Sequence, residues 1–83
     1  MVLEGIEEAA ESSIQVWPNP THGLLHIETE NLAFIEIRNL LGQVVLQAEQ
    51  VETVDLSHFE KGVYFLIANN KNGAKTVTKI IKE

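Results

Sequence analysis

Three histidines are the side chains in this sequence best suited to bind a metal ion or act as a base, and they stand at positions 22, 26 and 58. The spacing of His22 and His26 would place both rings on one face of a helix, where they could ligate zinc. Pro18, Pro20 and Gly23 argue against a helix in that segment, because proline lacks an N–H donor and restricts the preceding residue. We therefore expect three solvated histidines and no metal site.

Asp55, Ser57 and His58 supply the three residue types of a nucleophilic triad. Residues this close in sequence cannot readily place the base between the nucleophile and the orienting carboxylate. Glu28 and Glu30 fall on one face of an expected strand with no sign of a cleft, and the sequence contains no cysteine and no phosphate-binding glycine-rich loop. We expect no catalytic residue and no cofactor, so an enzyme is the class least favoured.

Composition narrows the choice of partner. Twelve acidic and six basic residues among 83 give a formal net charge of -6, which argues against nucleic acid as a ligand. The longest apolar run, residues 63–68, is far shorter than the roughly 20 residues of a membrane-spanning helix, so we expect no direct membrane insertion. The length suits one domain, and 45% apolar residues is a globular composition.

The chain divides into an acidic leader, residues 1–12, and a β-rich domain, residues 13–83. From residue 13 onward, short alternating segments are separated by turn residues at intervals of 8–12 residues. The expected strands are residues 14–17, 24–28, 33–38, 43–48, a weak fifth strand within 51–56, then 63–68 and 75–82. Alternation places Leu25 and Ile27 on one face of the second strand, and Ala33, Ile35 and Ile37 on the inward face of the third. This pattern predicts an all-β fold, a small immunoglobulin-like antiparallel β-sandwich of about seven strands.

Turn chemistry supports this division. Residues 39–42 read as a type I turn with Gly42 in the left-handed position, and residues 72–73 close a second hairpin. Residues 57–60 match a capping box and predict a single helical turn ending near Gly62. The fifth strand runs either through Val51, Thr53 and Asp55 or, in the other register, through Val54 and Leu56.

The last strand has an unusual pattern. Val77 and Ile81 share a face with two lysines, whereas Ile80 shares the other face with Lys82 and two threonines. Either a β-bulge or an edge position with projecting lysines would accommodate this arrangement.

Four spaced elements together resemble one known family. They are residues 16–23 (VWPNPTHG), 37–45 (IRNLLGQVV), 54–66 (VDLSHFEKGVYFL) and 79–82 (KIIK). The set resembles the C-terminal sorting domain of type IX secretion system substrates, also called the Por secretion system sorting domain, across residues 14–82. Trp17 stands where the family commonly has Tyr or Phe. The residues that carry the sorting-signal motif are Pro18, Asn19, Pro20, Gly23, Gly42, Gln43, Gly62, Tyr64, Lys79, Ile80, Ile81 and Lys82.

The resemblance implies a function that the residues alone do not. Such domains direct exported proteins of Bacteroidetes-type bacteria from the periplasm across the outer membrane, where the protein is secreted or displayed on the cell surface. The implied partners are the type IX translocon, its shuttle components and a sortase-like surface protease that removes the domain. Cleavage would then fall within residues 1–13.

Two further expectations concern recognition. We expect the final strand, with lysines taken to be exposed, to be the main recognition surface, by pairing of its edge with a secretion component. Exposed sheet edges would also allow two isolated copies to pair as a homodimer. The alternative function is an accessory immunoglobulin-like module that binds carbohydrate or protein, and an exposed aromatic platform would favour it; Trp17, Phe34, Phe59 and Tyr64 are the candidates.

Overall fold

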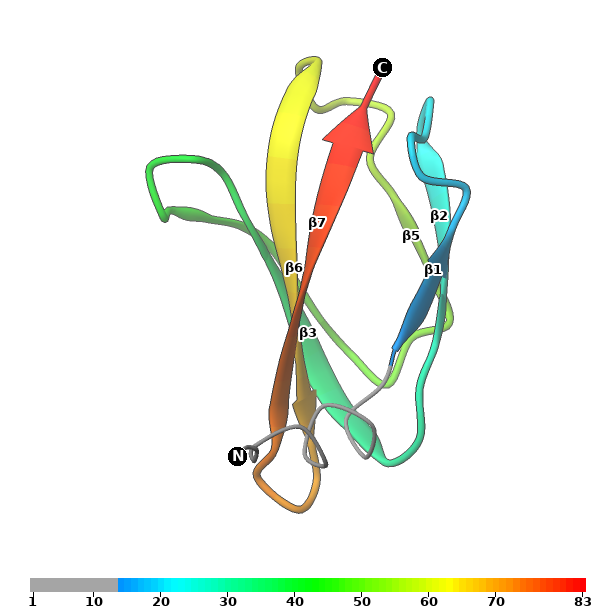
Figure 1. Ribbon diagram of the computed structural model, residues 1–83, viewed down its shortest axis with the longest axis vertical. Coiled ribbons are helices and arrows are strands. Elements are labelled where there is room, and N and C mark those ends of the chain that lie inside the picture. The colour runs from blue at the N-terminus through cyan, green and yellow to red at the C-terminus, as the bar shows by residue number, and fades with distance from the viewer. Residues whose placement is uncertain (1–13) are drawn as a thin grey trace, which may run out of the picture.

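The computed structural model of this chain describes residues 14–83, which form two antiparallel β-sheets packed face to face (Figure 1). The strands are β1 (Gln15–Trp17), β2 (Leu24–Glu28), β3 (Leu32–Arg38), β4 (Val44–Glu49), β5 (Thr53–Asp55), β6 (Gly62–Asn70) and β7 (Lys75–Lys82). Within residues 14–83 no helix is long and apolar enough to cross a membrane. The predicted acidic leader, residues 1–12, lies outside the described residues.

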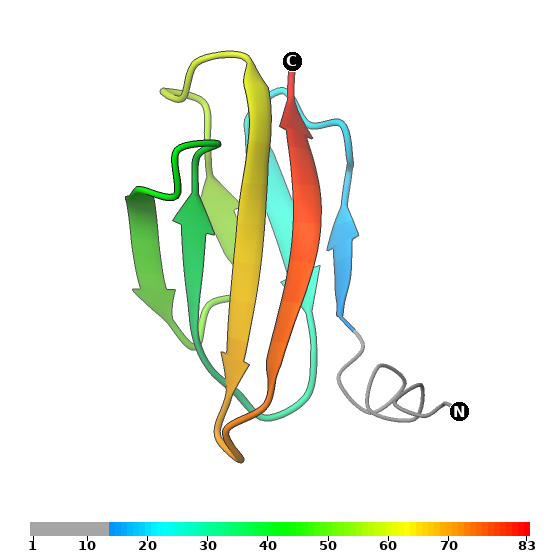
Figure 2. The same cartoon turned by 60° about the vertical axis from the view of Figure 1, so that its left-hand side comes forward.

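The strand order confirms the predicted all-β sandwich of seven strands. One sheet has the order β1-β2-β5 and the other β4-β3-β6-β7, and Figure 2 shows the four-stranded sheet in front of the three-stranded one. The chain changes sheet between β2 and β3, between β4 and β5, and between β5 and β6. These crossings bring the segments before β2 and after β5 to the same end of the sandwich as the chain end of β7 (Figures 1 and 2).

The core lies between the sheets and is built by period-two alternation. Leu25 and Ile27 of β2 point inward, as do Ile35 and Ile37 of β3, which confirms the faces predicted for both strands. β5 adopts the second of the two open registers, with Val54 buried and Leu56 buried just beyond the strand. The buried apolar set is completed by Tyr64, Leu66, Ala68 and Ile80.

The predicted β3–β4 turn is confirmed. Gly42 has φ +85° and its N–H donates to the carbonyl oxygen of Asn39 at 3.0 Å. The Asn39 side-chain oxygen accepts from the N–H groups of Leu41 and Gln43, both at 3.0 Å. Because this side chain satisfies two main-chain donors, it holds the hairpin in one shape. At the other end of the sheet, the predicted hairpin at Asn72–Gly73 is also present, with Gly73 at φ +92°.

The predicted helical turn at residues 57–60 is wrong. This segment is a non-helical turn in which the Phe59 N–H donates to the carbonyl oxygen of Leu56 at 2.9 Å. The expected capping role belongs to Asp55 instead, whose carboxylate accepts from the Ser57 N–H at 2.9 Å. An aspartate two residues before its donor forms an Asx-turn, which competes with a capping box for the same N–H groups.

The structure decides between the β-bulge and the edge position that the sequence left open for the last strand, β7. It is an edge strand that pairs with β6 without interruption from Lys75 to Lys82, so no bulge is present in this ladder. Ile80 points into the core, while Val77 and Ile81 lie on the outer face with Lys79. The two faces are therefore those predicted, and the edge position explains the exposed Val77.

Candidate functional site

Four sequence segments that are far apart in the chain lie at one end of the sandwich. They are the loop between β1 and β2, the β3–β4 hairpin, the loop between β5 and β6, and the end of β7, all in the upper half of Figure 1 and again of Figure 2. Together with the start of β6, which carries Gly62 and Tyr64, these segments hold every residue of the predicted sorting-signal motif. We call this region the motif end.

The β1–β2 loop continues the four-stranded sheet along the outer edge of β7. The Asn19 side chain donates to the carbonyl oxygen of Lys79 at 2.8 Å and accepts from the Ile81 N–H at 3.0 Å. Two residues on, the Thr21 N–H donates to the carbonyl oxygen of Ile81 at 2.9 Å, and the Glu83 N–H donates to the Thr21 oxygen at 2.8 Å. Thr21 and Lys82 thus form a parallel bridge. The first and last motif segments are one hydrogen-bonded unit.

Thr21 and Gly23 fix the path of this loop. Thr21 is fully buried, and its hydroxyl donates to the carbonyl oxygen of Leu24 at 2.7 Å and accepts from the Gly23 N–H at 3.1 Å. A Cβ at Gly23 would lie 3.1 Å from the Cβ of Ser57, so this position favours glycine for close packing. The Leu56 N–H donates to the Gly23 oxygen at 2.8 Å, which ties the loop to the end of β5.

The β5–β6 loop is anchored by Tyr64. Its hydroxyl donates to the carbonyl oxygen of Glu60 at 2.7 Å, and its ring packs on Phe59 at a centroid distance of 5.3 Å. A tyrosine near the start of this strand that bonds to backbone a few residues upstream is a feature of immunoglobulin-like sandwiches. Gly62, at φ +148°, begins β6 opposite Lys82. Tyr64 therefore packs in the core and also fixes the loop through its hydroxyl.

The final strand differs from the expectation in two respects. Lys82 was expected to be exposed, but it lies on the inner face of β7 at 7% exposure, with its Nζ 3.0 Å from the carbonyl oxygen of Glu83. Period-two alternation puts it on the same face as Ile80, so the pattern that buries one brings the other inward. Edge pairing at residues 79–83 is also obstructed, because Asn19 and Thr21 already hold the outer main-chain groups there.

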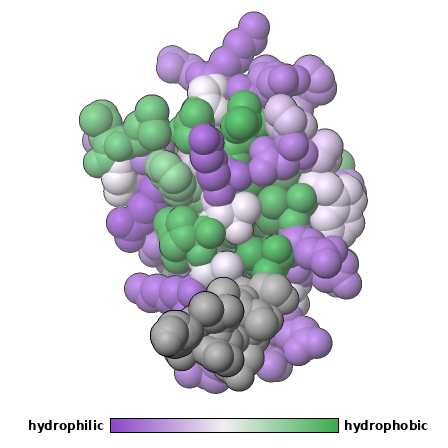
Figure 3. Space-filling model, viewed as in Figure 1, coloured by the Kyte–Doolittle hydropathy of each residue, from purple (hydrophilic) through white to green (hydrophobic). Residues whose placement is uncertain are grey.

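An exposed apolar surface covers the β3–β4 hairpin. Leu40 and Leu41 at its tip are 69% and 82% exposed, and Val44 and Val45 on the adjoining strand are also exposed. Figure 3 shows apolar side chains gathered on this projecting tip, at the upper left. We call these four residues the hairpin patch. Sequence reasoning assigned Leu40 and Leu41 to turn geometry, and Val44 and Val45 to the following strand. The two adjacent leucines at a turn tip were the signal that could have pointed to an exposed apolar surface.

The histidines do not form a site. Within residues 14–83 no three His, Cys, Asp or Glu side chains are placed to hold a metal ion. His22 lies 3.6 Å from a carboxylate oxygen of Glu83, and His26 stacks on Trp17. Asp55 is bonded to Ser57 directly, and hydrogen bonds from the Ser57 side chain and main chain lower the pKa of the Asp55 carboxyl. In a nucleophilic triad the histidine would stand between these two groups.

The aromatic candidates differ in exposure. Trp17 is 46% exposed on the outer face of the three-stranded sheet, Tyr64 is buried, and Phe34 and Phe59 are half-buried. Only Trp17 among these four offers an open aromatic surface.

The fold and the motif end define a small immunoglobulin-like module whose signature residues mostly hold its own loops in place. The chain belongs to the family of secretion system C-terminal sorting domains, which matches residues 15–83. A domain of this family is a sorting signal for type IX secretion, is recognised by the type IX machinery, and marks proteins that are exported to the cell surface or secreted through the outer membrane. No curated protein matches the chain.

Proposed function

We propose that this domain is a non-enzymatic signal that a translocon or shuttle component of the type IX system reads as a folded surface at the motif end. The observation that carries the proposal is the hairpin patch. Leu40 and Leu41 are the two most exposed large apolar side chains in residues 14–83, and contiguous exposed apolar surface marks protein interaction sites.

The residues of the motif end divide into two groups in this proposal. The side chains of Asn19, Thr21 and Tyr64 form hydrogen bonds within the domain. In this proposal these residues stabilise the structure of the motif end. The hairpin patch and the outer face of β7, with Lys79 and Ile81, supply what a partner contacts. Lys79 adds a positive charge that steers an acidic partner toward the apolar contact.

We further propose that a sortase-like surface protease removes the domain by cleavage within residues 1–13. This segment precedes β1, so cleavage there would leave the described sandwich intact. Mass spectrometry of the domain released from a surface-delivered fusion that carries the whole chain, residues 1–83, would give the bond directly. A fragment beginning within β1 or later would contradict this part of the proposal.

The recognition surface can be tested with a reporter that carries a periplasmic signal and residues 13–83, expressed in a host with a type IX system. We expect the unaltered fusion to reach the cell surface. Replacing Leu40→Ser together with Leu41→Ser should retain it in the periplasm, while unfolding by urea stays within about 0.5 kcal/mol of the unaltered domain because both side chains are exposed.

Leu24→Ser is the matched control, since Leu24 is an exposed leucine on the opposite sheet. It should be delivered normally. Delivery of the double variant at the normal level would exclude the hairpin patch as the contact. Retention of the unaltered fusion would contradict the sorting function of this chain itself.

A further inference from the structure

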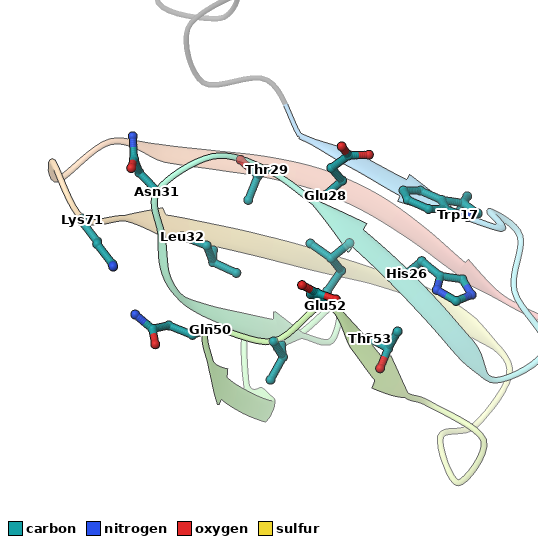
Figure 4. A pocket seen from close by; sticks show the side chains of 12 residues that line it. Trp17, His26, Glu28, Thr29, Asn31, Leu32, Gln50, Glu52, Thr53 and Lys71 are labelled. Atoms are coloured by element: carbon teal, nitrogen blue, oxygen red, sulfur yellow. The ribbon is translucent and has the colours of Figure 1, made fainter.

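A cavity of about 640 Å³ lies at the outer face of the three-stranded sheet and extends toward the end opposite the motif end (Figure 4). Trp17 and His26 stand at one side, and the loops that carry Asn31 and Gln50 form the other. This volume falls in the roughly 300–1,000 Å³ range of small-molecule sites. None of its lining residues belongs to the hairpin patch or to β7, the surfaces proposed above for recognition.

Trp17 gives the cavity an aromatic wall. It is the only tryptophan of the chain, and its ring stacks on His26 at a centroid distance of 5.4 Å and an interplanar angle of 19°. Burial in the core would make far greater use of so large an apolar ring. The stack instead holds the indole upright on the sheet surface, nearly half exposed.

The two amide side chains at the far side stand on strained backbone. Asn31 and Gln50, at φ 55° and 50°, are the only non-glycine residues of 14–83 in the left-handed region, and both line the cavity. Asparagine tolerates this conformation, but glutamine rarely adopts it. Such strain persists where surrounding structure enforces it, and it gathers at ligand sites.

Main-chain hydrogen bonds hold these loops. The Lys71 N–H donates to the carbonyl oxygen of Asn31 at 2.8 Å, and the Ile27 N–H donates to the oxygen of Glu52 at 2.8 Å. The cavity wall is therefore preorganised, which reduces the entropy lost when a ligand binds. Glu28 and Glu52 add two carboxylates to its lining.

We propose that this cavity binds a neutral saccharide. A sugar ring offers an apolar C–H face that suits the exposed indole of Trp17, and its neighbouring hydroxyls both donate and accept hydrogen bonds. The planar amides of Asn31 and Gln50 have both donors and acceptors, and the carboxylates of Glu28 and Glu52 accept from hydroxyls. Two carboxylates against the single cation of Lys71 disfavour a negatively charged sugar.

The full 83-residue chain can be titrated with maltotriose, cellotriose and mannotriose, and with trigalacturonic acid as the anionic probe. Because Trp17 is the only tryptophan, its fluorescence reports on the cavity directly, and amide NMR shifts locate the binding. At least one neutral trisaccharide should shift the amides of His26, Asn31 and Gln50 and leave Leu40 and Leu41 unchanged. The anionic probe should bind more weakly.

Variants separate binding from stability. Trp17→Ala should weaken the neutral saccharide by about tenfold. Gln50→Gly removes an amide and relieves the positive φ, so it should weaken binding about threefold or more without lowering the urea midpoint. Leu24→Ala, exposed on the same face but outside the cavity lining, should bind like the unaltered chain.

Three results would overturn the proposal. They are the absence of cavity shifts with all neutral probes, equal affinity in Trp17→Ala, and tighter binding of the anionic probe. None of them bears on export, because every measurement is made on the isolated chain.

Discussion

The side chain of Asn19 completes the edge of β7 by bonding to Ile81, 62 residues further along the chain, at 3.0 Å. Its amide nitrogen donates to the carbonyl oxygen of Lys79 at 2.8 Å. The Asn19 side chain therefore makes the pair of hydrogen bonds that the main chain of a neighbouring strand would make. The asparagine between two prolines is therefore a specific connector between the first and last motif segments.

Asn19→Ala should lower the free energy of unfolding by about 1–2 kcal/mol, because it removes two hydrogen bonds to main chain. Urea denaturation followed by circular dichroism measures the change. Asn19→Asp keeps the acceptor for Ile81 but sets a carboxylate against the Lys79 oxygen, so it should not restore stability. As a control, Asn72→Ala removes one local bond to Ala74 and should cost less than Asn19→Ala; equal losses would mean that Asn19 does no more than a local turn residue.

Thr21→Val should destabilise the domain by about 1–3 kcal/mol, although the two side chains have nearly the same shape. The valine leaves the carbonyl of Leu24 and the N–H of Gly23 without the hydroxyl that both contact in a fully buried position. Thr78→Val on the inner face of β7 is the control, since it is half-buried, and it should change stability by less than about 0.5 kcal/mol. An unchanged free energy of unfolding in Thr21→Val would contradict this prediction and would show that water takes over the hydrogen bonds of the hydroxyl.

Adjacent isoleucines on the final strand should respond differently. Ile80→Ala empties a fully buried position and should cost about 2–5 kcal/mol, whereas Ile81→Ala acts on a partly exposed outer face and should cost about 1 kcal/mol or less. Differential scanning calorimetry would rank the two. Truncation after residue 78 removes both and should unfold the domain, so deletion of this strand cannot separate recognition from folding. Equal losses in the two alanine variants would contradict the assigned faces.

Ser57→Ala should raise the pKa of the Asp55 carboxyl toward that of an ordinary aspartate, because the Ser57 hydroxyl is the main cause that lowers it. A carboxyl with a lowered folded-state pKa stabilises the fold above its unfolded pKa, near 4, and that contribution is lost as pH falls through the folded value. Carbon-detected NMR titration measures the midpoint. His58→Ala removes a weaker influence and should raise the pKa less; the reverse order would contradict this assignment.

Much of the fold follows from local pattern. Alternation at residues 24–28 and 33–38 predicted which side chains face the core, and Asn39 with Gly42 predicted the hairpin, because both depend on residues close in sequence. The helical turn predicted from the capping box at residues 57–60 was wrong. The pattern left out Asp55, two residues upstream of Ser57, whose carboxylate accepts from the Ser57 N–H.

The candidate site was less predictable. The motif residues could be identified, but the contact of Asn19 and Thr21 with β7 spans about 60 residues and depends on how the two sheets stack. The buried Lys82 donates from its ammonium group to the carbonyl oxygen of Glu83. The residue pattern did not predict this contact. Exposure of Leu40 and Leu41 is a tertiary property that turn propensity does not encode.

The parallel bridge between Thr21 and Lys82 couples the shape of the β1–β2 loop to the folding of the final strand. The loop around Pro20 is held to the final strand by main-chain hydrogen bonds of Thr21 to Ile81 and Glu83, so a copy with a frayed final strand would present a different surface there. A receptor that contacts this region would therefore bind copies with a paired final strand in preference to copies in which that strand is frayed.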